Sequence, residues 1–205
     1  MKLNTFNLVG EEVDLLKIIE KQIIKKGDVE LCNSNLSYFE SILNSCHFLK
    51  NYNHWYLTNS FKLKNNKQNA HILHVKTISL YNRPKSGEHT IVDNYLFGYF
   101  ETEKTLGHVF VRPETIEDKI NEFFTKTEID FESNPKFSKK YFMLSDNREL
   151  TENNVNHKFL SVVEDHNGLH IEIKNNKIIT TSLTNMNIDE VDRITDFCKR
   201  ASIVI

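Results

Sequence analysis

The chain has 205 residues, of which 39% are hydrophobic, 11% aromatic and 26% charged, as is usual for a globular protein. This length favours one domain over residues 1–205, with a core that needs no disulfide or metal to hold it, and three prolines and six glycines leave little material for a linker. The net charge of −2 argues against sequence-independent nucleic-acid binding, which needs a surplus of Lys and Arg.

The N-terminal segment lacks the apolar run that a secretory signal requires, because acidic residues begin at Glu11. No apolar stretch approaches the ~18 residues that a membrane-spanning helix needs. Cys32, Cys46 and Cys198 form no CxxC pair and are odd in number, which is typical of reduced thiols. We therefore predict a cytoplasmic protein without a membrane span.

Two helices are predicted first. Residues 11–26 carry apolar side chains at helical spacing, with acids in the first turn, lysines in the last, and Gly27 placed to end the helix. A second helix is expected from Ser37, which has capping-box spacing to Glu40, and its apolar stripe continues through Cys46 to Leu49.

The pattern then changes to that of strands. Segments rich in aromatic and β-branched residues occupy 54–64, 70–81, 90–101 and 106–111. The connections between the first three are short and polar, which favours antiparallel neighbours. The middle of the chain is therefore expected to form an antiparallel meander of about four strands.

The next segment mixes the two patterns. Pro113 is suited to the first position of a helix, and apolar residues follow it at helical spacing up to Phe124. A short strand is expected at 141–144 and a helix at 149–163.

The C-terminal part predicts a hairpin, with strands at 168–174 and 177–182 joined at Asn175, and then a helix capped by Asn187. Alternation along the first strand places Leu169, Ile171 and Ile173 inward and His170, Glu172 and Lys174 outward. The fold class is thus α+β, with an N-terminal helix pair, the meander, and then a helix, a β-hairpin and a C-terminal helix.

One block resembles a family of uncharacterised bacterial proteins. The R-P-E of 112–114, the I-D-F-E of 129–132, the P-K-F-S of 135–138 and Tyr141 fall in the order of that family's pattern. The similarity extends over about residues 106–163 and departs from the pattern at Gly107, where the family has proline. The family has no assigned activity, so the resemblance implies a shared fold and no chemistry.

The same block holds the only candidates for catalysis. Asp130 and Glu132 share a face if their segment is extended, and Arg112 is a third candidate. Paired carboxylates can act as acid and base when their surroundings separate their pKa values. The alternative is that both acids are solvated and that Arg112 makes a structural ion pair.

Other sites are not supported by spacing. His71 and His74 would point to opposite faces of a strand, and His166 and His170 have zinc-like spacing in a segment that does not look helical. Cys46 falls on an apolar stripe, as a core residue would. We expect no metal and no cofactor, since the chain also lacks the glycine-rich loops that hold phosphates.

Two hypotheses of function remain. The first is a non-catalytic binding or accessory domain that contacts a protein partner through an aromatic surface, with Tyr52, Trp55 and Tyr56 as the candidate residues. The alternative is a small hydrolase-like enzyme with a carboxylate–histidine site around Asp130 and Glu132. The absence of every local catalytic signature favours the first, and oligomeric state is left open.

Overall fold

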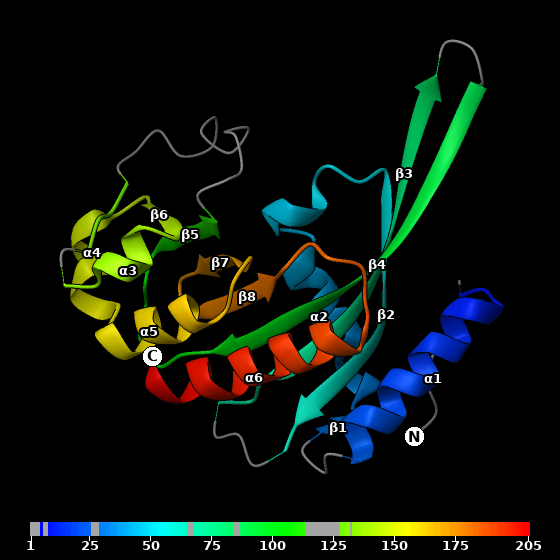
Figure 1. Ribbon diagram of the computed structural model, residues 1–205, viewed down its shortest axis with the longest axis horizontal. Helices are drawn as coiled ribbons and strands as arrows, with labels where there is room; N and C mark the ends of the chain where they lie inside the picture. The colour runs from blue at the N-terminus through cyan, green and yellow to red at the C-terminus, as the bar shows by residue number, and fades with distance from the viewer. Residues whose placement is uncertain are drawn as a thin grey trace.

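The computed structural model of the chain contains one antiparallel sheet with helices on both of its faces (Figure 1). It describes residues 5, 8–25, 29–64, 68–83, 87–113, 128–131 and 133–205. The strands are β1 (Val29–Leu31), β2 (His54–Leu63), β3 (His71–Arg83), β4 (Gly87–Glu101), β5 (His108–Pro113), β6 (Tyr141–Ser145), β7 (His170–Lys174) and β8 (Lys177–Thr181). The α-helices are α1 (Gly10–Lys25), α2 (Leu36–Leu43), α3 (Pro135–Ser138), α4 (Arg148–Asn154), α5 (His157–Asp165) and α6 (Ile188–Val204), and short 3-10 turns are η1 (Asn33–Asn35) and η2 (His47–Leu49). The predicted α+β class is confirmed, but the prediction of about four strands is wrong because the sheet has eight.

The strand order is β1-β2-β3-β4-β8-β7-β5-β6. The expected meander is present in β2, β3 and β4, which pair in sequence. Its fourth strand is not: β8 lies beside β4, from Gly98↔Thr180 to Glu101↔Lys177, and β5 pairs with β6 and β7 instead. The C-terminal hairpin therefore enters the middle of the sheet, a long-range pairing that short connections along the chain cannot reveal.

One face of the sheet is covered by α1, α3, α5 and α6. Each helix contributes side chains to one continuous core, among them Leu16 of α1, Phe159 of α5 and Phe197 of α6. The contact of α6 with β4 is close at Gly98, where an added Cβ would lie 2.3 Å from the Cys198 sulfur. Only a residue without a side chain fits this crossing.

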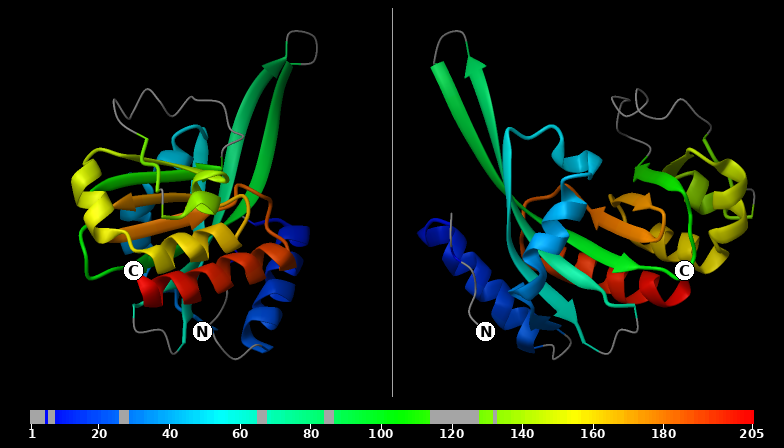
Figure 2. Two further views of the ribbon diagram at one scale, coloured as in Figure 1. Left: turned by 60° about the vertical axis from the view of Figure 1, so that its left-hand side comes forward. Right: turned by 180° about the vertical axis from the view of Figure 1, so that it is seen from behind.

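The other face carries α2 and η2, seen from behind in Figure 2. Phe39 of α2 packs against Tyr99 of β4 with ring centroids 5.2 Å apart, and Phe48 of η2 packs against Phe110 of β5 at 5.0 Å. This second layer changes one expectation. The predicted outward side chains of β7 point at α2 and η2, so His170 and Glu172 are buried instead of solvated.

Two predicted helices are interrupted. The second predicted helix ends at Leu43, because Cys46 has extended backbone angles before η2. It also begins at Leu36, where Asn35 makes no side-chain capping bond, so the capping box at Ser37 is not formed. The predicted helix at 149–163 is two helices, α4 and α5, because Asn156 breaks it and caps the second by accepting from Phe159 N–H.

Other local predictions are confirmed. The Asn187 side chain accepts from Glu190 N–H at 3.0 Å and caps α6. The β7–β8 turn has Asn175 at a φ of 58°, a conformation that Asn tolerates.

The prediction that Pro113 begins a helix is wrong, because Pro113 ends β5. The rest of that predicted helix lies outside the described residues.

The outer halves of β3 and β4 extend beyond the rest of the sheet as a two-stranded ribbon (Figures 1 and 2). The pairing of β2 with β3 ends at His54↔Ile78, whereas β3 and β4 remain paired as far as Arg83↔Gly87. On the other side, β8 pairs with β4 only from Gly98 onward. We call the ribbon formed by residues 79–83 and 87–92 the arm.

No described helix is both long enough and apolar enough to cross a bilayer.

Candidate functional site

The arm exposes large apolar side chains on both of its faces. Residues paired across antiparallel strands share a face, so alternation assigns each side chain to one side. Leu80 and Val92 lie on the face that continues under α1, and Tyr81 and Ile91 lie on the face that continues under α2. Their exposed fractions are 40%, 44%, 52% and 44%, respectively, so these four side chains present apolar surface to solvent on either side of one thin ribbon.

The three aromatic residues predicted from sequence lie at the root of the arm. Trp55 pairs with Thr77 and Tyr56 with Lys76, so neighbouring positions on β2 send these two side chains to opposite faces. Tyr52 packs on Tyr95 with ring centroids 6.0 Å apart, and both Tyr52 and Trp55 are partly buried against the α2-side core. Tyr56 is exposed. The aromatic residues therefore form the base of two separate surfaces.

A shallow hollow of about 380 Å³ adjoins this root. Its wall includes Trp55 and Tyr56 of β2 and Glu40 and Asn44 at the end of α2. Burial raises the pKa of the Tyr52 hydroxyl, although a hydrogen bond with Tyr95 acts against it, so this residue remains a neutral hydroxyl at physiological pH. The hollow thus combines the two aromatic side chains with the polar groups of Asn44, Asn53 and His54 and the carboxylate of Glu40.

The predicted carboxylate site is only partly described. Arg112 is buried on β5, with its guanidinium 5.0 Å from the centre of the Phe142 ring on β6. Asp130 is exposed and follows Ile129, whose N–H donates to the Met143 carbonyl on the edge of β6 that does not pair with β5. The backbone of β6 lies between β5 and this segment, and among the described residues no hydrogen bond or ion pair joins Asp130 to Arg112. Glu132 and Glu114 lie outside the described residues.

The histidines do not gather into a metal site. His71 packs on Phe39 of α2 at 4.6 Å, whereas His74 is hydrogen-bonded on the α1 side, so the two point to opposite faces as expected. His166 ends α5 and bonds to Asp196 at 3.0 Å, while His170 lies in β7. Within the described ranges, no three His, Cys, Asp or Glu side chains are placed to hold one metal ion.

A buried ion cluster centres on Glu172 of β7. Its carboxylate accepts from His47 N–H at 2.6 Å and from His108 Nε2 at 3.1 Å, and it pairs with Lys174 Nζ at 3.0 Å. Burial by itself raises the pKa of Glu172, but these three donors outweigh it and lower the pKa to about 2. A permanently ionised carboxylate with every neighbour donating to it is a poor proton acceptor, so the cluster holds η2 and β5 onto β7.

The two buried cysteines, Cys46 and Cys198, have no reactive character. Burial and the charge of Glu172 raise the pKa of the Cys46 thiol well above its usual range, and burial does the same for Cys198. Nucleophilic cysteines need the opposite shift. The prediction that Cys46 belongs to the core is confirmed, since it is fully buried.

Comparisons of the chain with protein-family models, with curated proteins and with solved structures give no match.

The sequence-based prediction missed the arm. Leu80–Tyr81 and Ile91–Val92 are adjacent apolar pairs, and in a strand such a pair places apolar side chains on both faces. That pattern is the one available signal. It is also typical of a strand buried on both sides, so by itself it does not distinguish the two cases.

Proposed function

We propose that the protein is a non-catalytic binding module that holds a protein partner along the arm and its aromatic root. The observation that carries this proposal is the exposure of Leu80, Tyr81, Ile91 and Val92 on a ribbon that no other described strand or helix covers. Apolar surface of this kind, gathered in one place, is typical of protein–protein interfaces.

The energetics of the ribbon support the same conclusion. A two-stranded hairpin is at best marginally stable in water, so a long one that exposes apolar side chains gains stability when a partner covers it. The partner would bury Tyr81 and Ile91 together with Trp55 on one face, or Leu80 and Val92 together with Tyr56 on the other. Aromatic side chains are enriched among the residues that dominate binding energy.

The hydrolase alternative has no comparable observation in its favour, because no hydrogen bond or ion pair joins Asp130 to Arg112 among the described residues, and Glu132 lies outside them. A cytoplasmic location and membership of the bacterial family suggested by 112–141 remain predictions from sequence. The three free cysteines are compatible with a reducing compartment.

A photo-crosslinking amino acid at position 81 tests the proposal in cells that produce the tagged chain. We expect a defined adduct with one protein from position 81 and none from position 203, since Ile203 is 74% exposed at the far end of α6 and serves as a matched apolar control. The double variant Tyr81→Lys, Ile91→Lys should lose that partner in co-purification, and Ile203→Lys should keep it. A partner that binds the arm variant as well as the unaltered chain would contradict the proposal.

A further inference from the structure

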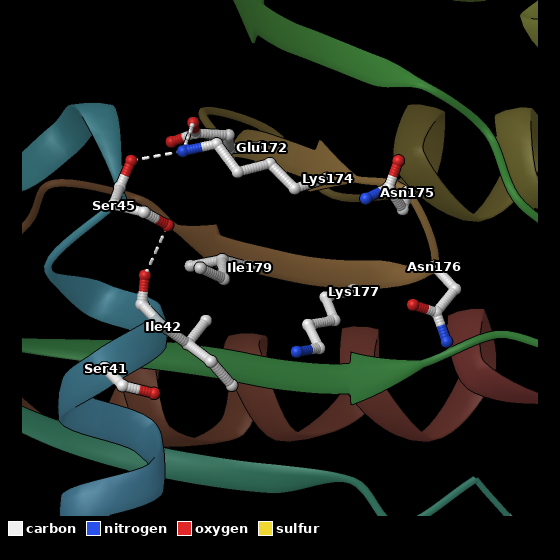
Figure 3. A pocket seen from close by; sticks show the side chains of 9 residues that line it. All are labelled: Ser41, Ile42, Ser45, Glu172, Lys174, Asn175, Asn176, Lys177 and Ile179. Carbon is white, nitrogen blue, oxygen red and sulfur yellow. Dashed lines mark hydrogen bonds and ion pairs between the residues drawn. The ribbon is translucent and has the colours of Figure 1, made fainter.

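A second hollow, which shares no lining residue with the arm, lies between α2 and the β7–β8 hairpin (Figure 3). Its volume is about 300 Å³, which is at the lower end of the range for small-molecule sites. Ser41 of α2 and Ser45, which follows that helix, line one side, and the turn residues Asn175 and Asn176 with Lys177 line the other. Ile42 and Ile179 supply the apolar part of its lining.

One wall of the hollow is electrically neutral and fixed. Lys174 pairs with Glu172 at 3.0 Å and also donates to the Ser45 carbonyl, so its ammonium is held against α2. Glu172 in turn is saturated by the His47 and His108 donors. The two opposite charges cancel, and this wall attracts neither sign of ligand.

The turn opposite is held by its backbone and leaves its side chains available. Asn175 N–H donates to the Gly107 carbonyl at 2.8 Å, and the Asn176 carbonyl accepts from Thr102 N–H at 2.9 Å. In the part of the chain that the structure describes, neither side-chain amide makes a hydrogen bond. Two amide groups are therefore presented by a turn that is already rigid.

Lys177 gives the hollow its net charge. Its ammonium extends toward α2 (Figure 3) and lies 5.5 Å from the centre of the Tyr38 ring. No carboxylate comes within 4 Å of it among the described residues. The hydrogen bond from Tyr99 is the main cause that lowers the pKa of Glu101, and a hydrogen bond from Tyr38 and the charge of Lys177 lower it further. A cation that rests on an aromatic ring without an ion pair is free to bind an anion.

The two serines contribute acceptors. Ser41 Oγ donates to the Tyr38 carbonyl at 2.7 Å and Ser45 Oγ donates to the Ile42 carbonyl at 2.8 Å. Because its one hydrogen is already donated to a nearby carbonyl, each hydroxyl oxygen offers only lone pairs to a ligand. The α2 side of the hollow thus accepts hydrogen bonds, and the Lys177 side donates them.

We propose that this hollow binds a small hydroxylated organic anion of the size of a hexose phosphate. Its anionic group bonds to the Lys177 ammonium and the Asn175 amide, and its hydroxyl groups donate to the oxygens of Ser41 and Ser45. The site shares no residue with the arm, so it stands or falls independently of the proposed partner surface.

Glucose 6-phosphate, glucose, inorganic phosphate and glucuronate are the probes for a titration followed by calorimetry and by amide chemical shifts. Glucose 6-phosphate should bind with a Kd of about 1 mM or tighter, and the shifts should centre on 175–177. Glucose, which lacks the charge, and inorganic phosphate, which lacks the hydroxyls, should each bind at least about tenfold more weakly. Glucuronate binding as tightly as the phosphate ester would support the same site with a carboxylate ligand.

Lys177→Gln should weaken glucose 6-phosphate binding about tenfold, while Lys158→Gln on α5, an exposed lysine elsewhere, should leave it unchanged. Asn175→Asp, which tolerates the same positive φ, places a negative charge at the hollow and should weaken binding at least as much; it serves as the second variant should Lys177→Gln unfold. No shift at 175–177 with any probe, equal binding of inorganic phosphate, or full binding by both variants would overturn the proposal.

Discussion

In both the inner and the outer halves of β3 and β4, large apolar side chains point alternately to the two faces, but only in the inner half are those faces covered by helices. In the inner half, Ile72 and Phe97 are fully buried, one on each face of the sheet, and helices cover both. In the outer half, the equivalent alternation leaves Tyr81 and Ile91 exposed. Strand formation is therefore shared by both halves, whereas stability comes only from the layers that pack on the inner one.

The inner half can even bury polar groups, because each finds a partner. His74 Nδ1 lies 2.6 Å from the Thr58 hydroxyl, and its Nε2 lies 3.0 Å from the Asn94 amide oxygen. Asn94 then donates to Glu12 of α1 at 2.8 Å, and Glu12 pairs with Lys76 at 2.8 Å. This network ties α1 to the sheet and is acceptable in the interior because every described member is hydrogen-bonded.

The largest expected effect follows from three buried histidines of the sheet, two in the inner half of β3 and one in β7. Burial is the main cause that lowers the pKa of His71, His74 and His170 to about 4 each, against about 6.5 in an unfolded chain. A lowered histidine pKa means that the unfolded state takes up protons first, so this stability is present above pH ~6.5 and is lost as pH falls toward 4. We expect the free energy of unfolding to fall by about 3 kcal/mol per pH unit between pH 6 and 4.5, or about 1 kcal/mol for each histidine.

Urea unfolding at several pH values measures this slope. His170→Gln should reduce it by about one third, whatever that variant's stability at pH 7.5, because one of the three titrating groups is gone. His157→Gln, a change at an exposed position of α5, is the control and should leave the slope intact. A slope that is unaffected by His170→Gln would show that other groups govern acid unfolding.

A second large effect is expected where α6 crosses the inner part of β4. Gly98→Ala would place a methyl group 2.3 Å from Cys198 Sγ and 2.7 Å from the Thr180 methyl, so the helix must move away from the sheet. We expect a loss of about 3 kcal/mol in the free energy of unfolding. Adding Cys198→Ala removes the nearer obstacle and should recover part of the loss, and a pair of changes with simply additive costs would argue against this contact.

Local signals in the sequence were sufficient for several elements. Asn187 caps α6 and Asn175 forms the β7–β8 turn because both act through their own backbone neighbourhood. The interruption at Cys46 and the position of β8 depend on partners far away in the chain, as in the bond from His47 N–H to Glu172. Periodicity assigns a side chain to a face, but it does not reveal whether that face is covered, and Glu172 was for this reason placed in solvent.

The candidate sites likewise differ in how far the sequence could reveal them. Tyr52, Trp55 and Tyr56 could be selected from sequence as an aromatic cluster, yet their division between two faces at the base of the arm requires the register of β2. The hollow beside Lys177 could not be found, since α2 and the β7–β8 turn are brought together only by the inserted hairpin.

A matched pair of substitutions tests the contrast between the two regions directly. Ile178→Ala removes a fully buried side chain of β8 and should cost about 2–5 kcal/mol, the usual range for such a cavity. Ile91→Ala in the arm should cost less than about 1 kcal/mol, because the side chain is already 44% exposed. Denaturant unfolding of both variants gives the comparison, and similar costs would mean that the arm is packed after all.

The smallest effect is expected at the most exposed of the four apolar side chains of the arm. Tyr81→Thr keeps a residue that favours strands but removes the aromatic surface, so the free energy of unfolding should change by no more than about 0.5 kcal/mol. The unfolding midpoint, measured at two protein concentrations tenfold apart, distinguishes the possible causes of a larger change. A cost above about 1 kcal/mol that grows with concentration would show that a second copy of the chain covers the arm, because only association makes stability depend on concentration. A larger cost that is independent of concentration would instead show that Tyr81 packs within its own chain, which would remove the distinction between the two halves of β3 and β4.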